Sequence, residues 1–526
     1  MGKRFFKLIF LLFVLGYYDV CCVSKTRQTY DTIIIGLGAA GTTAASTLAK
    51  AGKTVLALEA QDRIGGRVWT VPFGDGIVEL GAEWIHGSEN SWVYETAVQN
   101  NIPVFPQNTS FKVYKSDGTE GKTKLIDELL RYLIEVTDKP AEKPEPLGKF
   151  VTETLMEYLK ENYPEVLNDH DFINEFLDFT DLIINSDYGA KNWNYITAQP
   201  DYENLEGDQY ISWHRYGYKT FFEILLNTYK NGTGWPTLEI KLNKEVTLIN
   251  WPKSTTGNVE VVCKDGSVYI ANNVIVTVSL GVLKERYNSL FLPSIPASKA
   301  TVIDILSFGH VGKTIFSFQR AWWPDDPISV FFWSPEDKEA YKNDSWVVKI
   351  KTVARSMGSN NTLIVWSNGD TAKLIETLPE DVVKSKIMET IKKFMGKNLT
   401  VPEPTDMIRS KWNSNPYTRG VYTYDNLLKH EYPNARAILG EPLLDATGSP
   451  KVLFAGEATD LDHFSTVHGA SESGFREASR LLHLSTATKI ANPRDFLLYI
   501  IIRNLRRNIA NLDWILRKNR ENYESA

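Results

Sequence analysis

The chain has 526 residues, with 58 Lys and Arg against 64 Asp and Glu, which gives a formal net charge of −6. This acidic balance argues against nucleic acid as the main partner, and the length is sufficient for two domains with large cores. Only 3 Cys are present, so stability must come from the core rather than from disulfides. None of the 8 His forms an HExxH-type pair, and no metal site is predicted.

The N-terminus has the features of a signal peptide. Three cations precede the short apolar stretch Leu8–Tyr17, and Val20 and Cys22 occupy plausible −3 and −1 positions for cleavage. The stretch is too short to span a bilayer comfortably, although an uncleaved membrane anchor is the alternative interpretation. We therefore expect a signal peptide within residues 1–24 to be removed and the mature chain to be secreted. Five sequons would then permit N-glycosylation, at Asn108, Asn231, Asn343, Asn360 and Asn398.

Residues 30–67 form the most informative stretch of the chain. The apolar, β-branched run Thr32–Ile35 predicts a buried strand, and a glycine-rich turn and a helix-period pattern follow it. A second apolar run, Thr54–Leu58, predicts another strand that ends at Glu59. A strand, a glycine turn, a helix, a second strand and an acid about 20 residues on form the frame that binds dinucleotides.

Each glycine of the turn has a separate physical role. Gly36 allows the tight turn, Gly38 lets backbone N–H groups approach a pyrophosphate, and Gly41 lets the helix pack close to the strand. The helix N-terminus would then face the phosphates, and the Glu59 carboxylate would accept a hydrogen bond from a ribose hydroxyl.

A second glycine loop, with the sequence RIGGR at 63–67, follows the acid and could close over the diphosphate. The GxGxxG turn, the acid and the RxGGR loop together resemble the flavin monoamine and polyamine oxidase family. The resemblance implies that FAD is the cofactor, although Gln61 stands where the family often has arginine. Further cofactor contacts that it implies in this region are Ala40, Gly66 and Arg67.

The resemblance also implies the fold class. It predicts an α/β protein with a Rossmann-like FAD-binding domain assembled from three chain segments, and an α+β substrate domain inserted in two segments. The expected ranges are 30–90, 238–300 and 440–485 for the FAD-binding domain, and 91–237 and 301–439 for the substrate domain.

Residues 77–87 resemble a family segment whose backbone passes close to the flavin, which implies that Gly81, Ala82 and Trp84 contact the cofactor. The sequence WIHG at 84–87 is similar to the animal spermine oxidase branch, in which the histidine lines the substrate tunnel. The alternative for His86 is a structural histidine at a turn.

Residues 90–237 are predicted to be mainly helical. The expected helices are Lys124–Val136, Phe150–Tyr163, Phe172–Phe179 and Tyr218–Tyr229. Glu203, Glu206 and Asp208 could attract polyamine ammonium groups, but a solvated loop is the stronger interpretation of these acids.

From residue 238 onward the pattern predicts strands and one clear amphipathic helix. These elements are Leu242–Ile249, Val259–Cys263, Val268–Ile270, Val274–Val278, Ser329–Trp333, Trp346–Ile350 and Thr362–Trp366, with the helix at Asp381–Phe394. By resemblance, Val246 offers its backbone to the adenine.

Lys313 stands at the beginning of another apolar, strand-like run. A lysine at such a place is usually a solvated edge charge. The family, however, has a lysine here whose ammonium holds a water against flavin N5, so the resemblance implies that Lys313 is catalytic.

Two further segments near the C-terminus carry the resemblance. Residues 412–422 resemble the family's W-x-x-x-P-x-x-x-G-x-Y segment, in which Tyr422 forms an aromatic wall of the amine site. Val421 stands where monoamine oxidases have a flavin-linking cysteine, so FAD is expected to be bound non-covalently. Thr466 stands where the monoamine oxidases have the second aromatic residue of the cage around the amine. The segment around it instead resembles the spermine and acetylpolyamine oxidases, which implies that Thr466 lines the substrate tunnel. The implied cofactor contacts at this end are Gly456, Glu457, Thr466 and Val467.

The tail at 486–526 is not part of the resemblance. Residues 495–518 form a basic amphipathic pattern that could lie on an anionic membrane surface, or pack on its own protein or on a second subunit.

Together these features predict an FAD-dependent oxidase of polyamines that uses O2, releases H2O2 and gives an imine that water hydrolyses. One alternative is a secreted L-amino-acid oxidase, in which Arg419 would pair with the substrate carboxylate. Another is a catalytically silent flavin-binding interaction protein. A histone demethylase is disfavoured, because the signal peptide points away from the nucleus.

Overall fold

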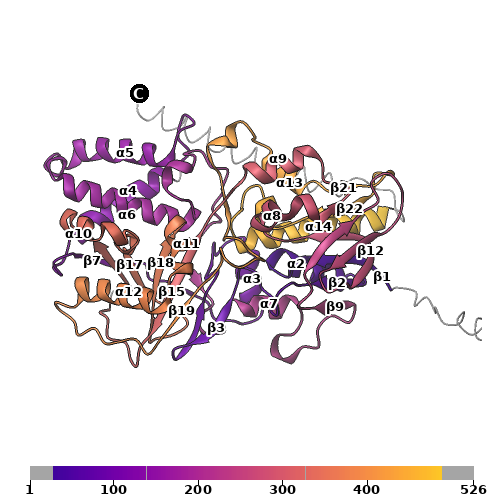
Figure 1. Ribbon diagram of the computed structural model, residues 1–526, viewed down its shortest axis with the longest axis horizontal. Coiled ribbons are helices and arrows are strands. Elements are labelled where there is room, and N and C mark those ends of the chain that lie inside the picture. Colours follow the sequence, from indigo (N-terminus) through magenta and orange to yellow (C-terminus); the bar gives the residue numbers. More distant parts are fainter. Residues whose placement is uncertain (1–27, 138, 326, 488–526) are drawn as a thin grey trace, which may run out of the picture.

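The computed structural model describes residues 28–137, 139–325 and 327–487. The predicted signal peptide at 1–24 and the basic pattern at 495–518 lie outside these residues. Figure 1 shows two halves, each built around one large sheet, and the chain passes from one half to the other repeatedly. No helix in the described part of the chain is long and apolar enough to cross a bilayer.

The first half contains a nine-stranded sheet with parallel central strands. β1 lies between β2 and β12, and its aliphatic side chains are buried because helices cover the sheet. β11 pairs with the beginning of β12 and β22 with its end, so a late segment completes the early sheet. The strands are β1 (Thr29–Ile35), β2 (Val55–Leu58), β9 (Leu238–Lys241), β10 (Val246–Asn250), β11 (Val259–Cys263), β12 (Val268–Val276), β13 (Phe291–Leu292), β21 (Leu443–Leu444) and β22 (Pro450–Phe454).

Two helices from opposite ends of the chain pack together on this sheet. α2 (Ala39–Lys50) follows β1 directly, and it lies along α14 (Val467–Ala487). Gly474 of α14 is so close to α2 that an added Cβ would stand 2.1 Å from the carbonyl oxygen of Ala40. Small residues therefore allow the beginnings of both helices to meet at one place.

The second half contains a six-stranded sheet in the order β19-β15-β18-β17-β16-β7. Side chains of β16 alternate between its faces: Val330 and Phe332 pack against α4, α5 and α6, whereas Phe331 packs against α12. The strands are β7 (Phe111–Lys115), β15 (Val311–Ser317), β16 (Ile328–Phe332), β17 (Thr352–Arg355), β18 (Thr362–Asn368) and β19 (Asp406–Arg409). The helices of this half include α4 (Thr123–Thr137), α5 (Leu147–Asn162), α6 (His170–Tyr188), α10 (Pro335–Ala340), α11 (Gly369–Thr377) and α12 (Glu380–Met395).

The remaining elements lie outside the two large sheets. The strands are β3 (Thr70–Phe73), β4 (Gly76–Glu79), β5 (Trp84–Ile85), β6 (Phe105–Pro106), β8 (Ile211–Ser212), β14 (Ser307–Phe308) and β20 (Thr423–Tyr424). The helices are α3 (Trp92–Gln99), α7 (Lys219–Leu225), α8 (Leu280–Leu290), α9 (Ala297–Ile305) and α13 (Ala435–Gly440). The predicted ranges assigned α3 and α7 to the substrate domain. In the structure α7 packs against α3 and against α2 of the nine-stranded half.

Several elements differ from their sequence predictions. Trp346–Ile350 was predicted as a strand but contains a 3-10 turn, because its buried residues are spaced as in a helix rather than alternating. The two predicted strands Val268–Ile270 and Val274–Val278 are one strand, β12, whose middle residues are polar and partly exposed. α6 continues well past the predicted end at Phe179, to Tyr188, where Gly189 has a φ of +66° and ends it.

Candidate active site

A cavity of about 660 Å³ lies at the junction of the two halves, and residues of α2, α6, β15 and the start of α14 line it. Every residue predicted to bind cofactor or substrate belongs to its wall, except Gly41. Segments from both ends of the chain therefore meet around one space.

The glycine turn after β1 has the backbone geometry that close approach requires. Gly36 has a φ of +94°, and Gly41 is so near the turn that an added Cβ would lie 2.0 Å from the Gly36 carbonyl oxygen. An added Cβ on Gly38, in contrast, would be 4.0 Å from its nearest protein neighbours, Gly65 and Gly66. Gly41 therefore fixes the start of α2, whereas Gly38 leaves the cavity open beside the turn.

Glu59 is buried at the end of β2 and binds the glycine turn. Its Oε2 accepts a hydrogen bond from the Leu37 N–H at 2.7 Å, and its Oε1 accepts one from the Gln61 N–H at 2.9 Å. Burial raises the pKa of Glu59, and these hydrogen bonds and the nearby Arg63 counteract part of the rise. Val246, at the beginning of β10, belongs to the same part of the wall.

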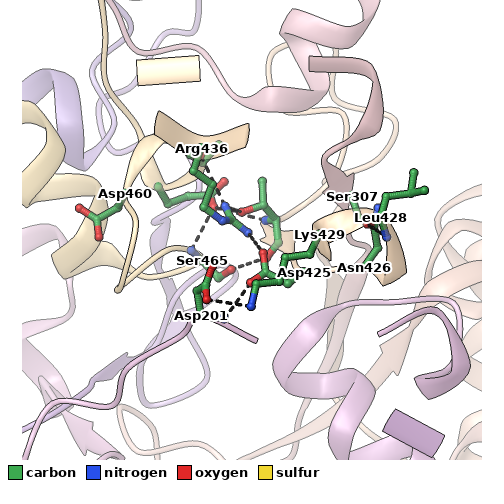
Figure 2. Close-up of polar contacts among 12 residues, drawn as sticks. Asp201, Ser307, Asp425, Asn426, Leu428, Lys429, Arg436, Asp460 and Ser465 are labelled. Atoms are coloured by element: carbon green, nitrogen blue, oxygen red, sulfur yellow. Dashed lines mark hydrogen bonds and ion pairs between the residues drawn. The ribbon is translucent and has the colours of Figure 1, made fainter. Parts of the chain in front are cut away.

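A series of polar contacts leads from the cavity into the protein. Arg67 Nη1 donates to Glu457 Oε1 at 2.9 Å, and Thr423 Oγ1 donates to Glu457 Oε2 at 2.7 Å. Arg436 Nη1 donates to Thr423 Oγ1 at 2.7 Å and Arg436 Nη2 pairs with Asp425 at 2.9 Å; Figure 2 shows these two charged side chains facing each other. Burial alone would raise the pKa of Glu457, but the charge and hydrogen bond of Arg67 outweigh it, so this pKa is lowered and Glu457 is ionised.

The turn after β22 and the beginning of α14 form another part of the wall. Gly456 has a φ of +139°, and its N–H donates to Ser473 Oγ at 2.8 Å. Thr466 Oγ1 accepts a hydrogen bond from the Gly469 N–H at 3.0 Å, so this threonine caps α14 as well as lining the cavity. Val467 is the first residue of α14, whose N-terminus favours a negative group in front of it.

Lys313 is buried rather than a solvated edge charge, since it is 4% exposed and β15 lies between β18 and β19. Its Nζ donates to the carbonyl oxygens of Glu79 and Gly81, each at 2.9 Å, and to Glu83 Oε2 at 2.7 Å. All three acceptors lie within residues 79–83, which run from the end of β4 to the start of β5. Ala82 of this segment belongs to the cavity wall. The ammonium therefore joins the six-stranded sheet to the segment predicted to face the flavin.

Aromatic rings lie beside this ammonium. Trp84 and Trp366 are stacked with their centroids 5.4 Å apart, and Lys313 Nζ is 4.4 Å from the centroid of Trp366. His86 lies edge-on to Tyr210 at 6.4 Å between centroids. Burial lowers the pKa of His86, so its imidazole is neutral at pH 7.

Asp187, near the end of α6, places a carboxylate in the cavity wall. It is accessible from the cavity, yet the surrounding protein desolvates it and raises its pKa to about 7. Its charge is the first cause of a raised pKa for Tyr210, and it adds to burial in raising the pKa values of Tyr202 and Tyr422. The Tyr422 hydroxyl donates to the Ser186 carbonyl oxygen at 2.6 Å, so its ring is held beside this carboxylate.

The Lys and Arg side chains of the cavity wall are all paired with carboxylates. The pairs are Arg67–Glu457, Lys244–Asp265, Arg286–Glu245 and Lys313–Glu83. Arg419 lies outside the wall, and its Nη2 donates to Glu285 Oε1 at 3.1 Å. Glu203, Glu206 and Asp208 are exposed and also lie outside the wall, in agreement with the solvated-loop interpretation.

Sequence reasoning did not identify Asp187, Trp366 or Glu83. Asp187 lies beyond the predicted end of its helix, and a strand tryptophan cannot be told from a core residue by pattern alone. Glu83 lies within the segment that carries the family resemblance, but its partner is far away in the sequence, so only the tertiary structure reveals the ion pair.

Outside the wall, Asp460, His463 and Glu472 bring potential metal-ligand atoms within 4.8 Å of one another. His463 Nδ1 contacts Glu472 Oε2 at 2.9 Å, and the His463 N–H donates to Asp460 Oδ1 at 2.9 Å. These protein contacts explain the grouping without a metal.

The first sheet is parallel at its centre, with a glycine turn after its first strand and an acid after its second. The cavity beside this turn extends to the second sheet. These features together define a dinucleotide-binding oxidoreductase. The family described as "Flavin containing amine oxidoreductase" matches residues 39–482, and the chain belongs to this family. The protein is therefore an FAD-dependent amine oxidase, as the sequence resemblance predicted.

Individual relatives agree with this assignment. The human peroxisomal N(1)-acetyl-spermine/spermidine oxidase is 29% identical, over 88% of this chain and 96% of the relative. The probable polyamine oxidase 5 of Arabidopsis thaliana is 27% identical, over 86% of this chain and 97% of the relative. Among solved structures, a triple mutant of putrescine oxidase matches with a TM-score of 0.61 at 19% identity, over 86% of this chain and 99% of that one, which confirms the predicted fold class.

Proposed function

We propose that this amine oxidase acts on polyamines rather than on amino acids or aryl monoamines. The observation that carries the proposal is Asp187, a carboxylate without a hydrogen bond or ion pair among the described residues, in a cavity with aromatic walls. Such a carboxylate attracts an alkylammonium group, and neighbouring aromatic faces add cation–π attraction. The α-carboxylate of an amino acid would need a free cation, and the Lys and Arg side chains of this wall are already paired.

A di- or polyamine has both kinds of group that the cavity requires. One nitrogen must be neutral for the carbon beside it to be oxidised, while another can remain charged and pair with Asp187. The neutral His86 and the hydroxyl of Tyr210 lie in the same wall and add polar contacts along a long chain. An aryl monoamine has one nitrogen and would leave Asp187 without a partner.

The wall itself fits FAD. The space beside Gly38 is open where a pyrophosphate would pass, Glu59 is held where a ribose hydroxyl would donate, and α14 begins beside the start of α2. FAD, when bound, accepts a hydride equivalent from the amine and passes the electrons to O2, which becomes H2O2, and water hydrolyses the resulting imine to an aldehyde and an amine. The residues of this chain bind the amine, orient it and hold the paired charges around the reacting atoms.

The test is a comparison of substrates with the purified holoenzyme. Release of H2O2 is measured with spermine, N1-acetylspermine, phenylethylamine and L-leucine. We expect the highest kcat/KM with one of the two polyamines. A higher value with phenylethylamine or with L-leucine would refute the proposal.

A further inference from the structure

We propose that Glu83 is a positioning residue that fixes the ammonium of Lys313 at the cavity wall; the role of Lys313 rests on the proposed function. The two side chains are among the most buried charges of the protein, 6% and 4% exposed, and their charged atoms are 2.7 Å apart. The other two acceptors of Lys313 are neutral carbonyl groups. Glu83 therefore supplies the only full negative charge that contacts this ammonium in the described structure.

Glu79, the other acid near this pair, does not replace Glu83. Burial raises the pKa of Glu79 to about 7, so near neutral pH its carboxyl group is partly protonated. Its oxygens are occupied by the Tyr218 N–H at 2.8 Å and the Thr70 hydroxyl at 2.9 Å. Only its backbone oxygen binds Lys313.

The segment that carries Glu83 is held rigidly, so it can fix the ammonium in place. An added Cβ on Gly81 would lie 1.9 Å from the Arg67 carbonyl oxygen, which shows how closely the two backbones approach. The indole N–H of Trp412 donates to the Leu80 carbonyl oxygen at 3.0 Å. An ammonium has three N–H donors, and in this site all three have acceptors on this one segment.

A fixed positive charge beside the flavin stabilises the negative charge that develops when O2 gains electrons. Loss of the Glu83 charge would leave the ammonium with neutral acceptors alone and would weaken its placement. We therefore expect Glu83→Gln to slow reoxidation of the flavin by about tenfold.

The experiment uses the holoenzyme without any amine. The flavin is photoreduced under anaerobic conditions, mixed with O2 in a stopped-flow instrument, and followed by absorbance. The visible spectrum before mixing reports FAD occupancy independently of activity. Because no substrate is involved, the result stands even if the parent enzyme oxidises none of the four test substrates, an outcome that would reject only the proposed function.

Two further variants separate positioning from stability. Glu83→Asp keeps the charge on a shorter side chain, so it should slow reoxidation less than Glu83→Gln does. Glu175→Gln removes the charged partner of Lys351, a pair 5% and 1% exposed that lies outside the cavity wall. It should lower the Tm without changing the reoxidation rate.

Reoxidation at the parent's rate in Glu83→Gln would overturn the proposal. Equal effects of Glu83→Gln and Glu175→Gln on the Tm, with neither changing reoxidation, would show that Glu83 is structural only. If Glu83→Gln fails to retain FAD, Glu83→Asp decides: reoxidation at the parent's rate would mean that the position of this carboxylate does not matter.

Discussion

Asp187 gives the substrate cavity a charge that depends on pH. Its pKa is raised by burial from 3.8 to about 7, so the carboxylate is present above this pH and is lost as the pH falls through it. We expect the KM for spermine to rise as the pH falls through about 7, with a smaller change in kcat. Asp187→Asn should raise the KM by about tenfold, some 1.4 kcal/mol of binding, and remove this pH dependence.

Steady-state release of H2O2, measured across this pH range, checks the expectation. Glu203→Gln is the matched control, because Glu203 is an exposed acid outside the wall, and it should keep the parent's KM. A KM for Asp187→Asn that equals the parent's at every pH would remove Asp187 from the binding site.

The burial of Lys313 decides what its replacement should do. An exposed lysine can be exchanged with little loss of stability. Lys313→Met, however, leaves the Glu83 carboxylate buried without its partner, which should lower the free energy of unfolding by about 3–5 kcal/mol.

The double variant Lys313→Met/Glu83→Gln separates folding from chemistry. With both charges removed, it should recover most of the lost stability while flavin reduction or reoxidation stays slowed by at least about tenfold. Denaturant unfolding and stopped-flow absorbance measure the two quantities. A single variant as stable as the parent would exclude the stabilising role of the ion pair, and a double variant with the parent's rates would exclude its role in the reaction.

At the scale of elements, the turn between β1 and α2 contains two glycines that serve different purposes. An added Cβ on Gly41 collides with the Gly36 carbonyl oxygen, so Gly41→Ala must displace the start of α2. We expect it to destabilise even the FAD-free protein by about 1–3 kcal/mol. Gly38→Ala meets no protein atom closer than 4.0 Å and should leave the FAD-free protein within about 0.5 kcal/mol of the parent while lowering FAD affinity.

Thermal unfolding of the FAD-free proteins and titration with FAD measure these two effects. The contrast between the variants is the test, since each serves as the control of the other. Equal destabilisation of both FAD-free variants would mean that Gly38 also has a packing role in the turn.

The same contrast shows which elements could be predicted from the sequence. The strand at Val259–Cys263 and the helix near Asp381–Phe394 follow from alternation and from an amphipathic face, and the structure has both. The glycine turn and Glu59 are close in the sequence and could also be placed. Trp346–Ile350 was predicted wrongly because composition outweighed spacing in assigning a strand.

The substrate side of the cavity could not be predicted in the same way, because tertiary pairing creates it. Trp366 reaches Lys313 as its direct cross-strand partner in the antiparallel pair of β15 and β18. Asp187 enters the cavity only because α6 extends past the length that its apolar pattern indicated. No periodicity within one segment contains these relations.

For the molecule as a whole, we propose secretion, which the N-terminal sequence supports. Residues 1–24 lie outside the described part of the chain, but the asparagines of all five sequons are exposed. After expression in a eukaryotic secretory host, we expect the medium to contain a chain that lacks the signal peptide predicted within residues 1–24 and that loses apparent mass on treatment with an endoglycosidase. Retention of residues 1–24 in the membrane fraction would instead support the uncleaved anchor.

FAD binding should link the two halves of the molecule without a covalent bond. The cavity wall combines residues of both sheets, and Val421, which belongs to this wall, cannot form a thioether with a flavin. Acid precipitation should therefore release the yellow colour into the supernatant. Because a ligand that binds only the native state stabilises it by mass action, free FAD at 100 times its Kd should add about 2.7 kcal/mol to the free energy of unfolding.

The measurement is thermal unfolding of FAD-free protein over a series of FAD concentrations. The Tm should rise with the logarithm of the FAD concentration, and unfolding of the two halves should become more cooperative, since both must separate before the cofactor leaves. Riboflavin, a control ligand that lacks the adenine and the pyrophosphate, should give a much smaller rise. Flavin that stays with the acid precipitate would contradict non-covalent binding, and a Tm that does not respond to FAD would contradict the coupling of the two halves through the cofactor.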